Sequence, residues 1–474
     1  MSRFRTTFAG ALILAAAAAL VAPASSSAQP VDDRLPPGLF ADHREAFMAR
    51  MDGGLAIFPT TPEIPRNDDA DHPWRQDSDL WWLTGFDEPG AYAVLRPGAP
   101  AGERYALFVR PKNPEEEVWT GYRAGVEGAR ERYAADLAFP VDSLEPVLAR
   151  WIDEVETVWY DASEDHPWAN PAVDSLLGEW SETEGHEVRD ADGITNRLRL
   201  VKDEGELALL EKAIDITVDA QRAAMAAIRP GMGEWEVEAL IEFVYRAHGA
   251  ARVGFNSIVG SGPNTTILHY VSNDRRMEAG DMVLMDIGAE WHHYTADVTR
   301  TVPVSGTFTP EQAAVYRIVL DAQKAVIDIV EPGITIADVQ RKGFEVVTEG
   351  LIREGFLEGT VEENLANRGY RPFLMHGVSH WLGLDVHDVG GYVSEGRPRT
   401  LEPGMVFTVE PGVYIAEGME GVDPKWWNIG VRIEDDILVT EDGHENLSAG
   451  APREIEAIEA LMAGRGLPEV VPAK

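Results

Sequence analysis

The sequence predicts two folded domains: an α/β domain, followed by a larger α+β domain built from two similar halves. Strand-like and helical segments alternate from about residue 43 to 190, which is typical of an α/β domain. From about Asn196 onward, an order of helix, helix and strands occurs twice. The junctions IRPGMGEWEV (228–237) and VEPGITIADV (330–339) share a Pro-Gly helix stop, a following apolar residue and a closing valine. Together with the repeated order of elements, they indicate two related halves.

The first 28 residues predict an export signal that lies outside the fold. Arg3 and Arg5 precede an apolar run from Ala9 to Ala22, and small residues follow at 26–28. This layout is typical of a secretory signal peptide, and the run is short for a membrane span. An uncleaved membrane anchor is the alternative. We therefore expect an exported protein, periplasmic or secreted, that has no membrane attachment after cleavage.

Composition excludes several classes of function. The chain has 41 basic and 80 acidic residues, a formal charge of −39, so its surface repels nucleic acid and anionic lipid. It has no cysteine, which excludes disulfides, thiolate metal sites and a thiol nucleophile. It also has no HExxH zinc motif and no GxSxG nucleophile elbow.

The expected first domain covers residues 36–190. Four segments have the apolar pattern of strands, and most are closed by proline or glycine: LAIFP (55–59), AYAVLRPG (91–98), RYALFVRP (104–111) and VWYDAS (158–163).

The expected second domain covers residues 196–465. A long amphipathic helix (202–228) stops at Pro230-Gly231, and a second helix covers 233–250. Strand-like segments fill 254–304. Thr309 then opens another helix as its N-cap, with proline at the first helical position, before a further helix and more strands.

Asp286 and Asp297 lie in one strand-like stretch, residues 281–304. If this stretch is a hairpin, its midpoint falls between Trp291 and His292, and the two aspartates lie opposite one another with Cβ atoms about 5 Å apart. Such close carboxylates repel, and a bound cation removes the repulsion. One carboxylate on the solvent face and one capping a turn is the alternative.

Glu410 and Glu434 are also embedded in apolar strand-like sequence, within 406–418 and 428–440. A buried glutamate is costly unless it is paired. Arg432 could neutralise Glu434, since the two lie two residues apart and share a strand face. Glu410 has no obvious partner.

The stretch HGVSHWLGLDVHD (376–388) adds three histidines, and its glycines argue against a helix. Four carboxylates balance two divalent cations, and oxygen-rich ligation with one imidazole suits manganese, cobalt, iron or zinc. Periodicity alone does not choose the histidine ligand, because His376 and His380 share a face on either a helix or a strand.

The motifs DIGAE…YTADVTRT, HGVSHWLGLDVHD, TVEPGVY and GVRIEDD resemble those of the pita-bread metallopeptidases, most closely the Xaa-Pro aminopeptidases (aminopeptidase P) and then the prolidases. The resemblance runs from about Arg197 to Met462, and SDLWWLTGFDEP (78–89) resembles their N-terminal domain. It implies a creatinase-like α/β first domain and a pita-bread α+β catalytic domain with two pseudo-symmetric halves. The segment 418–428 is less familiar, and nothing is transferred onto it.

The resemblance implies a role for each matching residue. Five would bind two divalent metals, with manganese favoured: Asp286, Asp297, His380, Glu410 and Glu434. Asp297 and Glu434 would bridge the metals, and Glu410 would also accept a proton. Three histidines would position the peptide and stabilise the tetrahedral intermediate: His269, His376 and His387.

Three further residues match positions near the substrate. Tyr414 and Arg432 match residues near the site. Trp81 matches an aromatic that reaches the substrate pocket of a neighbouring subunit, which implies a homo-oligomer, either a dimer or a tetramer. For Trp81, packing in the core is the alternative.

The implied reaction is hydrolysis of the N-terminal Xaa-Pro bond of peptides by a hydroxide that bridges the two metals. Because the proline nitrogen carries no hydrogen and its ring fixes φ, a dedicated pocket is expected. A prolidase, restricted to dipeptides, is the alternative, although the HGVSH and TVEPGVYIA regions resemble the aminopeptidase more. A metal-free binding protein on this scaffold is disfavoured, because all five ligand positions are intact.

Overall fold

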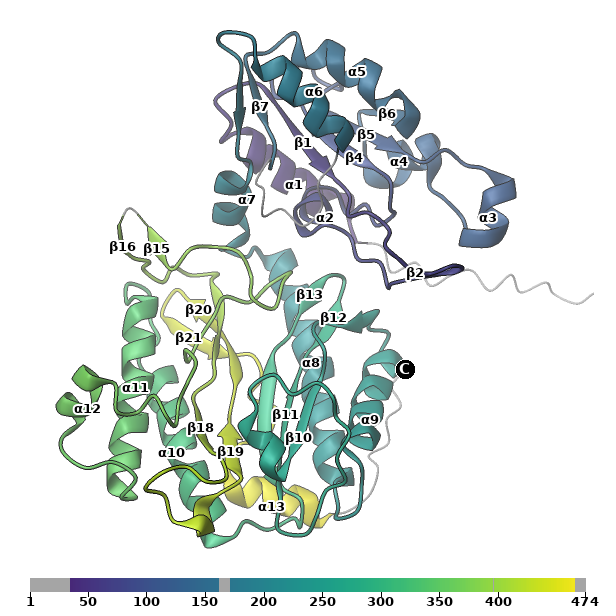
Figure 1. The fold of residues 1–474 in the computed structure, drawn as a ribbon. Coiled ribbons are helices and arrows are strands. Elements are labelled where there is room, and N and C mark those ends of the chain that lie inside the picture. Colours follow the sequence, from purple (N-terminus) through teal and green to yellow (C-terminus); the bar gives the residue numbers. More distant parts are fainter. Residues whose placement is uncertain (1–34, 162–170, 395, 465–474) are drawn as a thin grey trace, which may run out of the picture. The chain divides into compact units, whose positions relative to one another are not determined.

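The computed structural model describes residues 35–161, 171–394 and 396–464 (Figure 1). The expected signal peptide, residues 1–28, lies outside the described residues, so its prediction stays a prediction. No helix within the described ranges is both long and apolar enough to cross a membrane.

A six-stranded mixed sheet organises the first domain, in the order β6-β5-β4-β1-β7-β8. Strand β1 pairs in parallel with β7 and antiparallel with β4. The strands are β1 (Leu55–Pro59), β4 (Tyr92–Leu95), β5 (Tyr105–Val109), β6 (Leu137–Pro140), β7 (Thr157–Trp159) and β8 (Glu187–Arg189). Each of the four predicted strands overlaps an observed one, and the α/β class is confirmed; of the predicted strand 158–163, β7 holds residues 158–159, and residues 162–163 lie outside the described residues. Strands β6 and β8 lack a strong sequence signal because they are short and partly exposed.

Seven helices of the described chain accompany this sheet. They are α1 (Pro37–Met48), α2 (Ser78–Thr84), α3 (Pro114–Thr120), α4 (Gly125–Tyr133), α5 (Leu144–Ile152), α6 (Pro171–Ser181) and α7 (Asp192–Arg199). A small exposed hairpin, β2 (Pro65–Asn67) with β3 (Ala70–Asp71), precedes α2. Apolar side chains of the sheet and of α5 and α6 form the core of this domain.

The second domain repeats its order of elements, as predicted. The first half holds α8 (Glu204–Ala227), α9 (Glu234–Ala247), β9 (Arg252–Val253), β10 (Ile258–Ser261), β11 (Met282–Ile287), β12 (Ala289–Trp291), β13 (Tyr294–Thr295) and β14 (Val298–Pro303). The second half holds α10 (Pro310–Ile327), α11 (Ile336–Arg353), α12 (Val361–Asn367), β15 (Val393–Ser394), β16 (Arg397–Pro398), β17 (Val406–Val409), β18 (Gly412–Ile415), β19 (Ile429–Arg432), β20 (Asp435–Thr440) and β21 (Gly443–Asn446), and α13 (Ile455–Ala463) follows. The predicted α+β pita-bread class is confirmed.

The strands of the two halves meet between the helix pairs α8–α9 and α10–α11 (Figure 1). The first half contributes the sheet β10-β11-β14, and the second contributes β17-β20-β21 and the pair β18-β19. Hydrogen bonds join the halves, since Thr301 Oγ1 donates to the Arg432 carbonyl at 2.9 Å and Glu434 N donates to the Thr299 carbonyl at 3.1 Å. One apolar core spans both halves.

Capping residues set the helix starts that the sequence predicts. Thr309 accepts from the Gln312 backbone N–H, and Gln312 bonds back to the Thr309 N–H, which forms a capping box with Pro310 at the first helical position. Asp203 and Glu206 form the same reciprocal pair at the start of α8. The helix α8 ends at Ala227, before the Pro-Gly stop.

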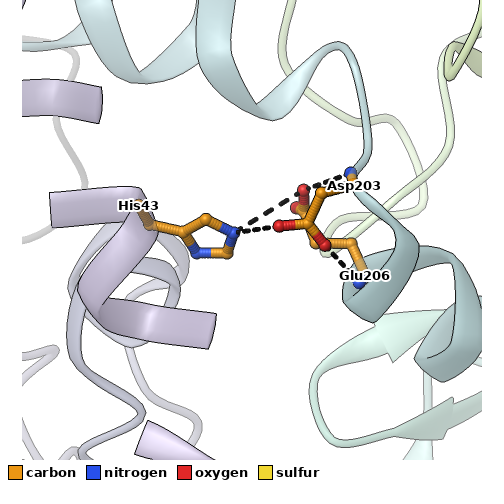
Figure 2. Close-up of side chains that lie close together, drawn as sticks. All are labelled: His43, Asp203 and Glu206. Atoms are coloured by element: carbon orange, nitrogen blue, oxygen red, sulfur yellow. Dashed lines mark hydrogen bonds and ion pairs between the residues drawn. The ribbon is translucent and has the colours of Figure 1, made fainter. Parts of the chain in front are cut away.

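A buried imidazole of α1 lies against the start of α8 (Figure 2). His43 Nδ1 lies 2.7 Å from the Trp82 carbonyl, and Nε2 lies 3.0 Å from Asp203 Oδ2 and 3.8 Å from Glu206 Oε2. Because both ring nitrogens face acceptors, both carry protons and His43 is an imidazolium. Its ring stacks on Trp82 at 4.1 Å. These three side chains could also be ligands, but the imidazolium accounts for the cluster without a metal.

Candidate metal centre

The hairpin that carries Asp286 and Asp297 forms, but its predicted register is wrong. Trp291 pairs with Tyr294, so the turn is His292-His293, and both of these residues have positive φ. The partner of Asp286 on β14 is Thr299, two positions beyond Asp297.

The register differs because the turn is centred between His292 and His293, one residue later than predicted, which moves each pairing partner on the second arm by two positions. Gly288 lies where the two arms approach closely: a Cβ there would come within 1.8 Å of the Ala296 carbonyl oxygen. Asp297 lies just before the first residue of β14, and its backbone N–H donates to Asp436 Oδ2 at 3.2 Å. Both aspartates nevertheless line one cavity.

The histidine-rich segment is extended, as its glycines predict. It runs beside β17: Thr408 N donates to the His380 carbonyl at 2.9 Å, and Glu410 N donates to the Val378 carbonyl at 2.9 Å. This pairing places His380 and Glu410 next to one another. His380 Nδ1 lies 3.0 Å from the Trp381 carbonyl and must donate to it, which leaves the Nε2 lone pair free for a metal.

Carboxylates of both halves surround that nitrogen. His380 Nε2 lies 3.4 Å from Asp297 Oδ2, 3.8 Å from Glu410 Oε1 and 3.8 Å from Glu434 Oε1. Ligand atoms of Asp297, His380 and Glu434 all lie within 4.8 Å of one another. All five predicted ligands line a cavity of about 500 Å³.

The charges of this cluster are unbalanced without a cation. Asp286 Oδ1 and Asp297 Oδ1 are buried, and no donor among the described residues reaches either atom. Burial, followed by repulsion from Asp286, raises the pKa of Asp297 well above its usual range; burial, followed by repulsion from Asp297, does the same for Glu434. Burial raises the pKa of Glu410 to about 7. Oxygen-rich ligands with one imidazole therefore fit one or two divalent cations, which would replace the missing donors.

The salt-bridge alternative required Arg432 to pair with Glu434. The structure does not show this pair. Arg432 Nη2 donates to Asp286 Oδ2 at 2.5 Å, and its Nη1 donates to the Tyr414 hydroxyl at 2.9 Å. The Tyr414 hydroxyl lies 2.7 Å from His376 Nε2. Arg432 and Tyr414 thus link Asp286 to His376. Tyr414 is almost completely buried, and Arg432 and His376 line the cavity.

Two more predicted histidines, His269 and His387, also line the cavity, and both are exposed to solvent. The His387 ring stacks on the His380 ring at 3.9 Å. Burial, and then the neighbouring His380, lowers the pKa of His387 to about 4; burial, and then Arg432, lowers that of His376 to about 4. Both imidazoles are therefore neutral at pH 7, when each can either donate or accept a hydrogen bond.

Trp81 does not match its expected role. Its side chain is 4% exposed and packs on Phe40, His293 and Tyr294. A side chain so covered has no surface to offer a neighbouring subunit, and it is not among the residues that line the cavity. The core-packing alternative holds, because α1 and the β12–β13 turn cover the Trp81 ring.

The predictions missed several supporting residues. Asp385 and Asp388, which had no assigned role, bind Arg199 Nη2 at 2.7 and 2.6 Å, and Asp388 also binds Lys202 Nζ at 2.9 Å. Arg199 in turn binds Asp79 of α2 at 2.8 Å. These buried ion pairs anchor the histidine-rich segment. Since every partner is distant in sequence, no local signal could have revealed them.

The chain is similar to known metallopeptidases in both of its domains. Residues 208–441 match the metallopeptidase family M24, and residues 40–159 match the aminopeptidase P N-terminal domain. The chain is 40% identical to the Xaa-Pro aminopeptidase of Escherichia coli over 430 residues, which cover 89% of this chain and 97% of that protein. It is 40% identical to that of Haemophilus influenzae, with coverages of 90% and 98%.

Solved structures are similar over the same length. Pseudomonas aeruginosa aminopeptidase PepP superposes with a TM-score of 0.87 at 42% identity, covering 91% of this chain and 99% of that one. A variant of Escherichia coli aminopeptidase P gives a TM-score of 0.87 at 39% identity, with the same coverages.

Proposed function

The chain belongs to metallopeptidase family M24 and is a metal-dependent aminopeptidase, and on that premise we propose that it releases the N-terminal residue from peptides with proline in the second position. The observation that carries this proposal is the convergence of Asp286, Asp297, His380, Glu410 and Glu434 on one cavity. A metal-free binding protein would have no need for buried carboxylates whose oxygens lack donors.

The proposed centre holds two divalent ions, with manganese our first choice because four oxygen ligands and one imidazole suit it. When bound, such ions supply a hydroxide nucleophile and polarise the scissile carbonyl. Asp297 and Glu434, which lie 3.4 and 3.8 Å from His380 Nε2, would hold the ions together with that imidazole.

The remaining residues of the cavity handle the peptide. Glu410, whose pKa burial raises toward neutrality, is suited to move a proton to the proline nitrogen as it leaves. We propose that His269 and His387, which are exposed in the cavity, hydrogen-bond the peptide carbonyl. His376 contacts the Gly377 carbonyl and the Tyr414 hydroxyl with its two ring nitrogens, so we propose that it positions the peptide by shaping the cavity wall. Tyr414 and Arg432 keep His376 oriented through the 2.7 Å contact between His376 and the Tyr414 hydroxyl.

We also propose that the protein is exported and forms a homo-oligomer. The layout of residues 1–28, in which two arginines precede an apolar run and small residues, supports export. An exposed apolar cluster on and after α3 supports self-association: Val118, Trp119 and Tyr122 are 80%, 87% and 95% exposed. Clustered apolar side chains of this kind mark protein interfaces.

One experiment separates the aminopeptidase from a prolidase. Purified protein loaded with manganese is incubated with an Xaa-Pro dipeptide and with an Xaa-Pro-Zaa tripeptide, and the released amino acid is quantified. We expect the tripeptide to be cleaved. Cleavage of the dipeptide alone would overturn the aminopeptidase assignment, and cleavage of neither peptide with any divalent ion would overturn the enzyme itself.

A further inference from the structure

A second cavity, of about 620 Å³, lies in the second half of the catalytic domain. Helices α11 and α12 and the hairpin β15–β16 enclose it. Its lining is mostly apolar and includes Ile336, Ala337, Phe344, Leu365, Tyr392 and Val393. This groove is open to solvent at the hairpin, where Tyr392 is 44% exposed and Val393 is 60% exposed.

The groove shares a wall with the metal-binding cavity. Tyr392 lines both. Gln340, which lines the groove, accepts from Val378 N at 2.8 Å and donates to the Ser379 carbonyl at 3.0 Å. A Cβ on Gly377 would lie 3.1 Å from the Gln340 amide. The segment from Gly377 to Ser379 therefore separates the groove from the cavity by one layer of chain.

The charge of the groove also differs from that of the chain. Acidic residues number 80 of 474, yet none of the described residues that line the groove is acidic, and its cation Arg341 pairs with Asp338 at 2.7 Å. A peptide that extends from the metal centre past Tyr392 into this groove would bring a terminal carboxylate. The described lining has no negative charge that would repel this carboxylate, and its apolar side chains can contact an apolar side chain of the peptide.

In the proposed reaction, only the residues after the proline could reach this groove. Only one residue precedes the scissile bond, so contacts away from the metal centre are made by residues after the proline. We propose that the groove is a substrate subsite that binds an apolar side chain downstream of the proline, so that the enzyme prefers longer peptides with such a residue. This inference rests on the proposed aminopeptidase function.

The test compares hexapeptides that begin Ala-Pro and continue with serine, in which leucine replaces each serine in turn. We expect one leucine position to raise kcat/KM by about tenfold over the all-serine peptide, because burial of most of a leucine side chain is worth that much. A tripeptide, Ala-Pro-Ser, measures activity without the groove. Equal kcat/KM for leucine at every position would overturn the subsite.

Two groove variants, Val393→Asp and Ala337→Asp, place a carboxylate in the lining at exposed positions. We expect each to remove most of the leucine preference through KM while the tripeptide rate stays unchanged. Phe243→Asp is the matched control, because Phe243 is 57% exposed and lies outside both the groove and the exposed cluster at α3.

The outcomes keep the two proposals apart. If Ala-Pro-Ser is not cleaved by the unmodified enzyme, the proposed function fails. If it is cleaved but the groove variants keep the leucine preference, only the subsite fails. If Val393→Asp instead dissociates the protein, as light scattering would show, and the preference is unchanged, then the groove is an interface between copies and the subsite is again overturned.

Discussion

Two imidazole rings lie face to face at the metal centre, and they differ in what they can bind. His380 is buried, its Nδ1 is held by a carbonyl, and its Nε2 faces three carboxylates. His387 is exposed at the mouth of the cavity. The inner ring is therefore suited to a metal and the outer ring to substrate, although both come from one short segment.

We predict that His380→Ala loses bound metal and activity together. Removal of the one imidazole ligand leaves the carboxylates without their neutral partner, so we expect at least one of two ions to be lost and the rate to fall about a thousandfold. Metal analysis after gel filtration, paired with a peptide assay, measures both. Retention of two ions would show that His380 is not a ligand.

We predict that His387→Ala keeps its metal but loses rate. Loss of one hydrogen-bond donor to the developing oxyanion should lower kcat by about a hundredfold. The same metal analysis applies, with the His380→Ala variant as its comparison. Equal loss of metal in the two variants would contradict the separate roles.

Local motifs were sufficient to find the residues of the centre, but not their geometry. Four of the five proposed ligands, Asp286, Asp297, Glu410 and Glu434, are carboxylates inside strand-like apolar sequence, and that conflict is visible in sequence. The fifth, His380, was assigned only from the motif that contains it. The partner of Asp286 was missed because the turn is centred at His292-His293, one residue beyond the predicted midpoint, and this shifts each pairing by two positions. The partner of Arg432 was missed because strand neighbours were considered, whereas Asp286 approaches from the other half of the domain.

At the scale of elements, the contact between α1 and α8 depends on charge. Burial lowers the pKa of His43, but the Asp203 hydrogen bond and the Glu206 charge outweigh it and raise that pKa above its usual value. Burial opposes ionisation of Asp203, but the His43 hydrogen bond lowers its pKa. The histidine contribution to stability is complete below about pH 6.5 and is lost as pH rises through the raised pKa. The aspartate contribution is lost as pH falls through its lowered pKa.

We therefore predict that Asp203→Asn lowers Tm more at pH 5.5 than at pH 9. Asparagine keeps the N-cap of α8, so the substitution removes mainly the charge. Thermal unfolding at the two values of pH measures the effect. In a His43→Gln background, Asp203→Asn should lower Tm by the same amount at both values of pH. If Asp203→Asn lowers Tm equally at pH 5.5 and pH 9 when His43 is present, the charged pair is refuted.

The order of elements was predictable because helix caps and Pro-Gly helix stops are formed by residues that are adjacent in the sequence. Thr309 with Pro310, and the stop after α8, are examples. Short strands such as β6 and β8 were not predicted, since each depends on a partner strand that is distant in sequence. The burial of Trp81 likewise depends on α1 and on the β12–β13 turn, which no local pattern reveals.

At the scale of the whole molecule, the exposed apolar cluster at α3 predicts self-association. We expect Trp119→Glu to lower the oligomer mass measured by light scattering, because a charge would replace an 87% exposed indole at the contact. Phe243→Glu, which changes another exposed aromatic that is 57% exposed, is the control. An unchanged mass in Trp119→Glu would exclude this cluster as the interface.

Metal removal should destabilise the whole catalytic domain. Ions that bind only the folded chain stabilise it by about 2.7 kcal/mol at a free concentration one hundred times Kd. We predict that a chelator lowers Tm at pH 8, and that readdition of manganese restores it. The chelator should have little effect on His380→Ala, and an equal fall in that variant would point to binding elsewhere.

The ligands are divided between the two halves of the catalytic domain. Asp286 and Asp297 precede α10, whereas His380, Glu410 and Glu434 follow it, and hydrogen bonds between β14 and the chain at 432–434 hold the sets together. Neither half alone can bind as the pair does. Metal affinity therefore depends on how completely the two halves associate. A chain cut between β14 and α10 would bind metal again only after the two fragments reassociate.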